Sequence, residues 1–495
     1  MPRRTNRRKP RTSKCYHAVY TDLVSSAAVI HHEQVRGFAK FLAFLLLLIV
    51  IGGGVAWFWA GRQPGPAVQF RQPDKYVGQT SELDLMVQTP QGQLSRLDVT
   101  IEQSGKSIPV FTLSQPTQAT TRQDSADRFY VMRPIGKRAI PELQAGPARI
   151  VVHAARPVLR GMRQAESQTT RDVQVRLEPP RVAVVSTFHY VNLGGAEFVV
   201  YRATPADVES GVRVGDRVYP GFPGTAVGIK SDPAIRVAFF ALAYDQDLKT
   251  PISVFARDPA GNLAVTTLDH MPFTKPFSRS TIPVDSWVDR VVPPIVENTP
   301  DLKLSTAPDD IVETFVHINS DLRRQNAQTI AELAKKTAPE MMWSEPFEPL
   351  VNAAVEAKFA DFRTYTYKGK EIDRQVHLGF DLAVTQQVPI KAAQRGVVVH
   401  AAYLGIYGNC VIIDHGLGVQ TLYGHLSSIG VKVGDKVEKG QVIGRSGMTG
   451  LAAGDHLHFT VLVNGTAVNP VEWWDSKWMQ DRVFRKIMEA GGSVT

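Results

Sequence analysis

The chain has 495 residues, of which 43 % are apolar, so it is long enough for several domains with folded cores. Its two cysteines, Cys15 and Cys410, exclude a four-cysteine zinc site. The net charge of +9 does not indicate nucleic-acid binding, because residues 1–40 carry nine basic and two acidic side chains, which gives +7 and leaves only +2 for the rest of the chain.

An uncharged apolar run follows this basic tail. Residues 41–60, which end in Trp57, Phe58, Trp59 and Ala60, would span about 30 Å as a helix, the thickness of the hydrocarbon core of a bilayer. A cleaved signal peptide is the alternative, but its charged and apolar parts are shorter, and no small-x-small cleavage site follows Ala60. We therefore expect a transmembrane helix over residues 41–61, with the basic tail in the cytoplasm and the remaining chain outside it.

The next part of the chain has the pattern of β-strands. Short β-rich runs broken by Gly, Pro and Asn continue to about residue 270, which is typical of sandwiches or barrels, and Pro179-Pro180 divides them. We expect a β-rich module over 62–178 and a second one over 179–300. Residues 252–265, with an Asp-Pro-Ala-Gly-Asn turn, resemble the last hairpin of bacterial immunoglobulin-like modules.

Helical spacing then replaces the strand pattern. Ile311, Phe315, Ile318 and Leu322 recur at helical intervals, and residues 329–336 continue in the same way. This predicts a helical connector over residues 301–345. A helical tail is expected over 476–495.

The candidate metal-binding and catalytic residues are concentrated in one segment near the C-terminus. Six of the 13 histidines lie there, at positions 377, 400, 415, 425, 456 and 458, together with Asp381. A catalytic zinc needs three nitrogen or oxygen ligands from the protein and a fourth position for water. The histidines left over suit the acid–base work that hydrolysis requires.

Three stretches of this segment resemble the motifs of the M23 family (lysostaphin-like, LytM) of zinc metallopeptidases, which cut peptides in bacterial cell walls. They are His-Leu-Gly-Phe-Asp-Leu-Ala at 377–383, Leu-Tyr-Gly-His-Leu at 422–426 and His-Leu-His-Phe at 456–459. Residues 388–398 are similar to the strand pair that follows the first motif. The resemblance implies a zinc peptidase domain with an antiparallel β-sheet over residues 346–475, so the whole chain is expected to be mainly β.

The resemblance also implies residue roles. His377, Asp381 and His458 would bind one Zn²⁺, and His425 and His456 would be the unliganded catalytic histidines. Because residues i and i+2 of a strand face the same side, His456 and His458 can share one cleft. His456 is favoured as the group that takes the proton of water, and His425 as the group that binds the oxyanion or protonates the leaving amine. The chain has no His-Glu-x-x-His helix to supply a glutamate base.

Several neighbouring residues are assigned to other roles. His400 and Cys410 are expected to be structural, and His415 to be structural with a supporting role near the site as the alternative. For Tyr423, donation to the reaction intermediate and simple packing stay open. Asp455 replaces a proline that is common in the family beside the catalytic histidine.

These features predict a membrane-anchored zinc metalloendopeptidase that hydrolyses peptide bonds of peptidoglycan on the outer side of a bacterial cytoplasmic membrane. The expected partners are peptidoglycan, the membrane through residues 41–61, and proteins of the division or elongation machinery, with no nucleic acid. A non-catalytic scaffold that activates another wall hydrolase is the main alternative, and a protease acting on proteins is a third. The bond cleaved, the ligands of the β modules and any blockage of the cleft stay open.

Overall fold

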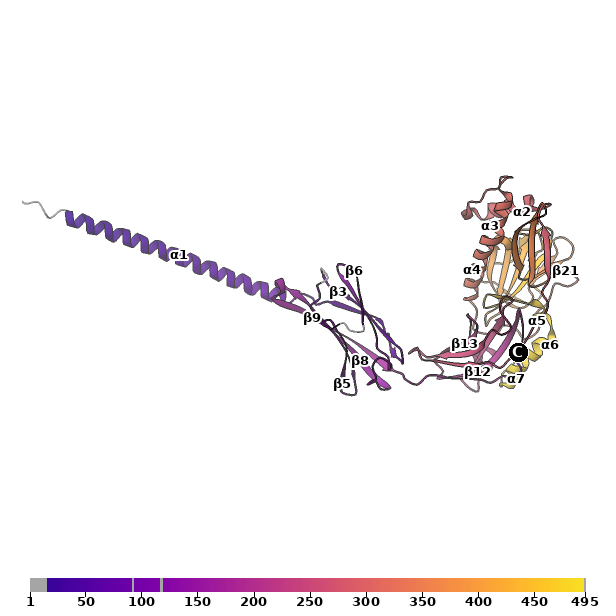
Figure 1. The fold of residues 1–495 in the computed structure, drawn as a ribbon, viewed down its shortest axis with the longest axis horizontal. Coiled ribbons are helices and arrows are strands. Elements are labelled where there is room, and N and C mark those ends of the chain that lie inside the picture. The colour runs from indigo at the N-terminus through magenta and orange to yellow at the C-terminus, as the bar shows by residue number, and fades with distance from the viewer. Residues whose placement is uncertain (1–15, 91–92, 116–118, 494–495) are drawn as a thin grey trace, which may run out of the picture. The chain divides into compact units, whose positions relative to one another are not determined.

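The computed structural model describes residues 16–90, 93–115 and 119–493, and this described part is mainly β, as the sequence predicts (Figure 1). The chain divides into two compact units, Met1–Val175 and Arg176–Thr495. The basic residues up to Lys14, and Cys15, lie outside the described residues. The module boundaries expected after residues 178, 300 and 345 stay predictions.

The first unit begins with a long helix, α1 (Tyr16–Ala60), drawn in indigo in Figure 1. Its part from Gly37 to Ala60 is long and apolar enough to cross a membrane. The predicted span of residues 41–61 begins four residues later than this part and ends one residue beyond it.

Two antiparallel sheets and one short parallel pairing complete the first unit. Apolar side chains alternate along their strands, so that Leu83, Leu85, Leu97 and Val99 are buried while their neighbours are not. One sheet has the order β1 (Ala67–Gln72), β3 (Glu82–Gln88), β7 (Arg128–Pro134), β6 (Thr120–Ser125). The other has the order β2 (Tyr76–Val77), β9 (Arg163–Val175), β8 (Gly146–Val158), β4 (Arg96–Gln103), β5 (Lys106–Thr112), with the turn η2 (Leu159–Gly161) between β8 and β9.

The second unit opens with another pair of sheets and a short parallel pairing. The first sheet has the order β10 (Arg181–Val184), β12 (Gly195–Thr204), β16 (Ile235–Leu242), β15 (Phe222–Pro223). The second has the order β14 (Arg217–Pro220), β13 (Glu209–Val214), β17 (Ile252–Arg257), β18 (Leu263–Thr267). The short pairing joins β11 (Tyr190–Asn192) and β19 (Met271–Phe273), and η3 (Gly224–Val227) follows β15.

Three further sheets lie in the C-terminal part of the second unit. The largest has the order β21 (Ala354–Ala357), β24 (Phe380–Ala383), β32 (Leu457–Val463), β28 (Val419–Leu426), β27 (Asn409–Asp414), β26 (Gly396–Tyr403), β30 (Lys436–Val437), with β33 (Thr466–Val468) also paired to β32. A second has the order β20 (Arg279–Pro283), β22 (Asp361–Tyr367), β23 (Lys370–His377). The third has the order β25 (Pro389–Lys391), β31 (Val442–Arg445), β29 (Ser428–Ile429), and η6 (Gly405–Tyr407) follows β26.

Helices precede and follow these sheets. The segment expected to be helical contains α3 (Ile311–His317), the π-helical turn η5 (Ile318–Leu322) and α4 (Arg323–Ala334). Helix α2 (Val288–Asn298), which contains Pro293-Pro294, lies in the segment over 179–300 that was expected to be a β-rich module. After β33 come α5 (Pro470–Trp474), α6 (Ser476–Met479), η7 (Gln480–Phe484) and α7 (Arg485–Glu489), and η4 (Pro300–Leu302) follows α2.

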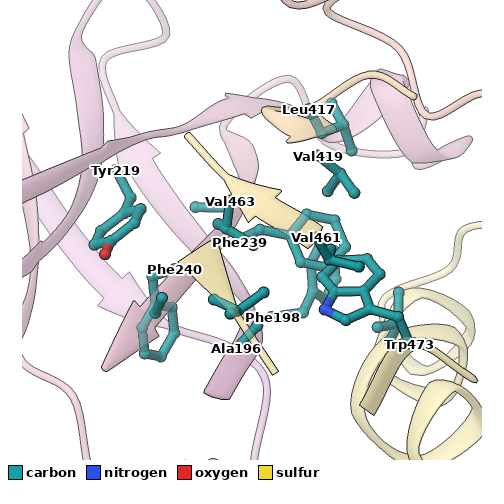
Figure 2. Packing of buried hydrophobic residues seen from close by; sticks show 14 of the residues in the cluster. Ala196, Phe198, Tyr219, Phe239, Phe240, Leu417, Val419, Val461, Val463 and Trp473 are labelled. Carbon is teal, nitrogen blue, oxygen red and sulfur yellow. The ribbon is translucent and has the colours of Figure 1, made fainter. Parts of the chain in front are cut away.

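One hydrophobic core joins the N-terminal sheets of this unit to its C-terminal sheet. Phe239 of β16 lies with its ring centroid 5.6 Å from that of Trp473 in α5 and 6.0 Å from that of Trp343. Figure 2 shows Phe198 and Phe239 beside Val461 and Trp473, which come from segments more than 200 residues later in the chain. The sheets over 181–267 therefore share their core with the C-terminal sheet and do not form an isolated spacer.

A buried ion pair fastens the last helix to these sheets. Lys486 of α7 lies 2.8 Å from the carboxylate of Glu197 on β12, and both side chains are essentially inaccessible to solvent. Burial raises the pKa of Glu197 and lowers the pKa of Lys486. Lys486 also donates to the carbonyl of Phe198, and the backbone N–H groups of Tyr190 and Phe198 donate to Glu197. Both members of the pair thus have further hydrogen-bond partners.

We expect Lys486→Met to lower the free energy of unfolding of this unit by about 3–5 kcal/mol, because Glu197 would stay buried without its cation. Urea denaturation of the full chain, followed by tryptophan fluorescence, measures the change. Lys477→Met is the control: it breaks an ion pair with Asp481 in which Lys477 is 83 % exposed, so the change should stay below about 1 kcal/mol. Equal effects of the two substitutions would contradict this account of the pair.

Candidate active site

Strand register brings the candidate ligands together. Asp381 of β24 is the direct partner of His458 on β32, and Gly424 of β28 is the partner of His458 on the other side. His377 ends β23 and pairs with Asp361 of β22. Three neighbouring strands and the end of a fourth thus place the predicted residues in one cluster.

The three predicted metal ligands are in mutual contact. Nε2 of His377 lies 2.9 Å from Oδ1 of Asp381 and 3.0 Å from Nδ1 of His458. Nδ1 of His458 in turn lies 3.0 Å from Oδ1 of Asp381. All three side chains are buried. The structure therefore brings one carboxylate oxygen and two imidazole nitrogens close enough to one another to bind a single metal ion.

Hydrogen bonds on the outer side of the rings fix which nitrogens carry protons. Nδ1 of His377 lies 3.1 Å from the carbonyl of Lys358, to which only an N–H can donate. The hydroxyl of Thr460 donates to the carbonyl of Leu378, so it accepts from Nε2 of His458 at 3.0 Å. Burial lowers the pKa of His458 to about 4, which keeps this ring neutral. The inward nitrogens, Nε2 of His377 and Nδ1 of His458, are therefore the ones that face the carboxylate of Asp381.

This donor set fits a divalent metal. Two imidazole nitrogens and a carboxylate oxygen converge here at 2.9–3.0 Å from one another, and a cation among them would be bound by all three. Two histidines and one carboxylate, each held by an outer hydrogen bond, form a ligand set used for catalytic zinc. The residues present are those that would hold the ion.

Arg363 holds the outer oxygen of Asp381. Its guanidinium lies 3.0 Å from Oδ2 of Asp381 and 3.2 Å from Oδ2 of Asp361, and Asp361 also accepts from Ser280. Burial alone would raise the pKa of Asp381, but the histidines around its carboxylate, His377 foremost and then His456 and His458, hold it well below its usual range. The motif pattern did not reveal Arg363, because it lies on another strand, outside the matching segments.

The two predicted catalytic histidines lie beside the ligands. Nδ1 of His456 donates to the carbonyl of Gly454, and its Nε2 lies 3.4 Å from Oδ1 of Asp381. Nδ1 of His425 donates to the carbonyl of Thr449, and the ring centroids of His425 and His456 are 4.8 Å apart. Each ring thus keeps Nε2 for another partner.

The environments of these two rings differ. Burial, together with His456 and His458, lowers the pKa of His425 well below its usual range. Burial also lowers the pKa of His456, but the hydrogen bond and charge of Asp381 outweigh this effect and raise it. His425 also has a φ of 62°, a left-handed conformation that is strained for a side chain other than glycine. Strain of this kind persists where the surrounding structure imposes it, as it does at functional sites.

Gly379 leaves the space that His458 fills. A Cβ atom at position 379 would lie 2.6 Å from Cε1 and Nε2 of His458 and from Oγ1 of Thr460. No side chain fits there without displacing the imidazole. This explains in physical terms why glycine separates His377 from Asp381.

The cluster opens into a cleft, which we call the catalytic cleft. Besides the five residues, its lining includes Trp287 of the loop before α2, Arg323 of α4, Tyr407 of η6, and Glu356. The tyrosine ring centroid lies 5.4 Å from that of His458. Residues of the helical segment thus contribute to the wall of the cleft.

The other candidates lie elsewhere. His415 is buried between the carbonyl of Arg395 and the hydroxyl of Thr421, and the hydroxyl of Tyr423 bonds to Thr421 and to the N–H of Ala393. Tyr423 therefore packs in the core. The ring of His400 bonds to the carbonyl of Ala402, Cys410 is buried among apolar residues, and Asp455 accepts from the N–H of Gln387.

Comparison with known proteins agrees with this geometry. Residues 375–470 match the model of peptidase family M23. The DD-carboxypeptidase/endopeptidase Mpg of Neisseria meningitidis is 44 % identical over 97 residues, which are 20 % of this chain and 22 % of that protein. The peptidoglycan DD-endopeptidase ShyA of Vibrio cholerae is 44 % identical over 96 residues, 19 % of this chain and 22 % of that protein.

The chain thus matches about a fifth of the length of these curated relatives. Among solved structures, the catalytic domain of lysostaphin from Staphylococcus simulans is similar to 29 % of this chain, at 28 % identity, with 96 % of that domain covered and a TM-score of 0.19. The segment that matches the family model, residues 375–470, contains all five residues of the cluster. The C-terminal part of this mainly β chain is therefore a peptidase domain of family M23.

Proposed function

We propose that the chain is a membrane-anchored zinc metalloendopeptidase that hydrolyses peptide bonds of peptidoglycan. The observation that carries this proposal is the convergence of two imidazole nitrogens and Oδ1 of Asp381, with two further histidines beside them. The names of the relatives support peptidoglycan as the substrate, and the apolar helix Gly37–Ala60 supports the anchor.

His377, Asp381 and His458 would hold the metal. When bound there, Zn²⁺ would supply Lewis acidity toward a water and a peptide carbonyl. Arg363 keeps one oxygen of Asp381 occupied, so that the carboxylate offers its other oxygen to the cluster. The outer hydrogen bonds of His377 and His458 keep both rings in the ligating tautomer.

His456 and His425 would move protons. Nε2 of His456 faces the carboxylate of Asp381 at 3.4 Å, which would place it to accept the proton of a water held beside the ligands. His425 lies on the other side of His456, and its Nε2 could bind the oxyanion as N–H or return a proton to the leaving amine. A scaffold without catalysis would not need all five groups, and this chain retains them.

The direct test is incubation of the purified full chain, in detergent, with peptidoglycan. New amino termini should form in the presence of zinc and disappear with a chelator. The full chain is used because the peptidase sheet shares its core with residues 191–268. His456→Ala should lower the rate by a factor of about 10² or more, since general acid–base catalysis contributes that much. Unchanged peptidoglycan in the presence of zinc would favour the scaffold.

Gly379→Ala should weaken zinc binding by roughly 10- to 100-fold, the usual cost of disturbing the surroundings of a ligand, because the new methyl group displaces His458. Competition with a chromogenic chelator measures the affinity without reference to activity. Gly430→Ala is the matched control, since a Cβ there would meet its nearest atom at an ordinary 3.5 Å. Equal zinc affinity of the two variants would show that this packing does not position the ligand.

The anchor predicts that the full chain stays with membranes during a carbonate wash, whereas a chain lacking residues 37–60 is released. Burial of about 20 apolar residues makes extraction without detergent unfavourable. Fractionation of cells followed by immunoblotting gives the readout. Recovery of the full chain in the soluble fraction would contradict the anchor.

A further inference from the structure

A second hollow adjoins the catalytic cleft. It has a volume of about 850 Å³, within the range of ligand sites. Its lining comes from β20, β22, β23, the start of α4 and Tyr244, and it shares Arg323 and Arg363 with the catalytic cleft. The two hollows therefore meet at these two side chains.

Arginine dominates the lining. Five arginines take part, and none of the other residues of the described chain that line the hollow is acidic. We call it the arginine groove and define it by the residues Tyr244, Arg279, Ser280, Thr281, Ser320, Arg323, Arg324, Ala327, Phe362, Arg363, Thr364, Arg374, Gln375, Val376 and Leu378.

Three of these arginines are already neutralised. Arg324 pairs with Asp321, Arg374 with Glu371, and Arg363 with Asp361 and Asp381. Within the described residues, no carboxylate lies within 4.0 Å of the guanidinium of Arg279 or of Arg323. These two arginines leave positive charge without a partner in the groove.

Arg323 is held in position for an anion. Its Nε donates to the carbonyl of Asn319 at 2.9 Å and its Nη2 donates to the side-chain oxygen of Asn319 at 2.6 Å. The amide nitrogen of Asn319 is in turn fixed by Asp373 at 2.7 Å. The side chain is half-buried, and its Nη1 has no hydrogen-bond partner among the described residues. Little side-chain entropy remains to be lost when a carboxylate accepts from Nη1.

Arg279 is the second arginine that can contact an anion in the groove. Its guanidinium lies over the ring of Phe362, 5.2 Å from the centroid, and the ring of Tyr244 meets Phe362 edge-on at 6.2 Å. Arg279 and Phe362 are direct partners across β20 and β22. Stacking restricts the guanidinium plane and leaves its N–H edge for a planar anion such as a carboxylate.

We propose that the arginine groove binds free carboxylates of an acidic peptide, the part of a peptidoglycan stem peptide that extends beyond the bond in the catalytic cleft, through Arg279 and Arg323. This inference rests on the proposed function, because the peptide is taken to be the substrate. The two arginines determine specificity, and they take no part in the reaction itself.

The test uses a synthetic acidic stem peptide and the same peptide with its carboxylates amidated. Their affinities for the full chain in detergent, treated with a chelator to prevent hydrolysis, are measured by fluorescence anisotropy at fixed ionic strength. The amidated peptide should bind roughly tenfold more weakly or worse, as expected for the loss of a charge-assisted hydrogen bond. Arg279→Gln and Arg323→Gln should each weaken binding of the acidic peptide to a similar extent and leave the amidated peptide unaffected.

Arg202→Gln is the control. Arg202 lies on β12, and its substitution removes one positive charge from an ion pair with Asp232, far from the groove in the sequence. Both peptides should bind this variant as they bind the wild type. With zinc restored, Arg279→Gln should raise KM and leave kcat unchanged. Arg279 is exposed, so its substitution does not threaten the fold and gives the decisive result even if Arg323→Gln is unstable.

Equal affinity for the two peptides, or an unchanged affinity in Arg279→Gln, would overturn the proposal. So would tighter binding of a DNA duplex than of the acidic peptide, since the groove would then recognise phosphate. The outcome is separable from the proposed function. Discrimination between the peptides without cleavage in zinc would support the groove and contradict the enzyme, whereas cleavage without discrimination would do the reverse.

Discussion

The register between β24, β32 and β28 is the constraint on which the site depends. Asp381 and His458 lie in one cluster because they are direct cross-strand partners, with Gly424 beside them. A shift of one residue in this pairing would turn either side chain to the opposite face of the sheet. The backbone pairing of these strands thus determines which side chains lie together in the site.

Packing holds that register. One face of β32 carries His458 and Thr460, while the alternate residues Leu457, Phe459, Val461 and Val463 lie in the core shared with Phe239 and Trp473. A strand buried on both faces cannot slip without exposing apolar side chains on one side and burying imidazoles among them on the other. The sheets over 181–267 therefore support the site indirectly, by fixing the strand that carries His458. The buried pair of Lys486 and Glu197 fastens α7 to one of these sheets.

The sequence predicted the five clustered residues because each lies in a short motif whose spacing is a local property. The main elements of the helical segment were likewise visible from the interval between Ile311, Phe315 and Ile318. The shared core was not predictable, since Phe239 and Trp473 are more than 200 residues apart and each looks like an ordinary buried aromatic in its own strand or helix. Arg363 and the arginine groove were missed for a related reason: their roles depend on which charges are left without partners after folding, and local patterns contain no record of that.

The central claim is that two histidines and one aspartate form a zinc site with two unliganded histidines beside it. X-ray absorption at the zinc edge of the zinc-loaded full chain tests it most directly. The account predicts ligand atoms at about 2.0–2.2 Å that comprise two imidazole nitrogens, one carboxylate oxygen and one further light atom, with the spectrum lost in Asp381→Ala. A shell with three or more imidazoles, with sulfur, or without any retained zinc would contradict it.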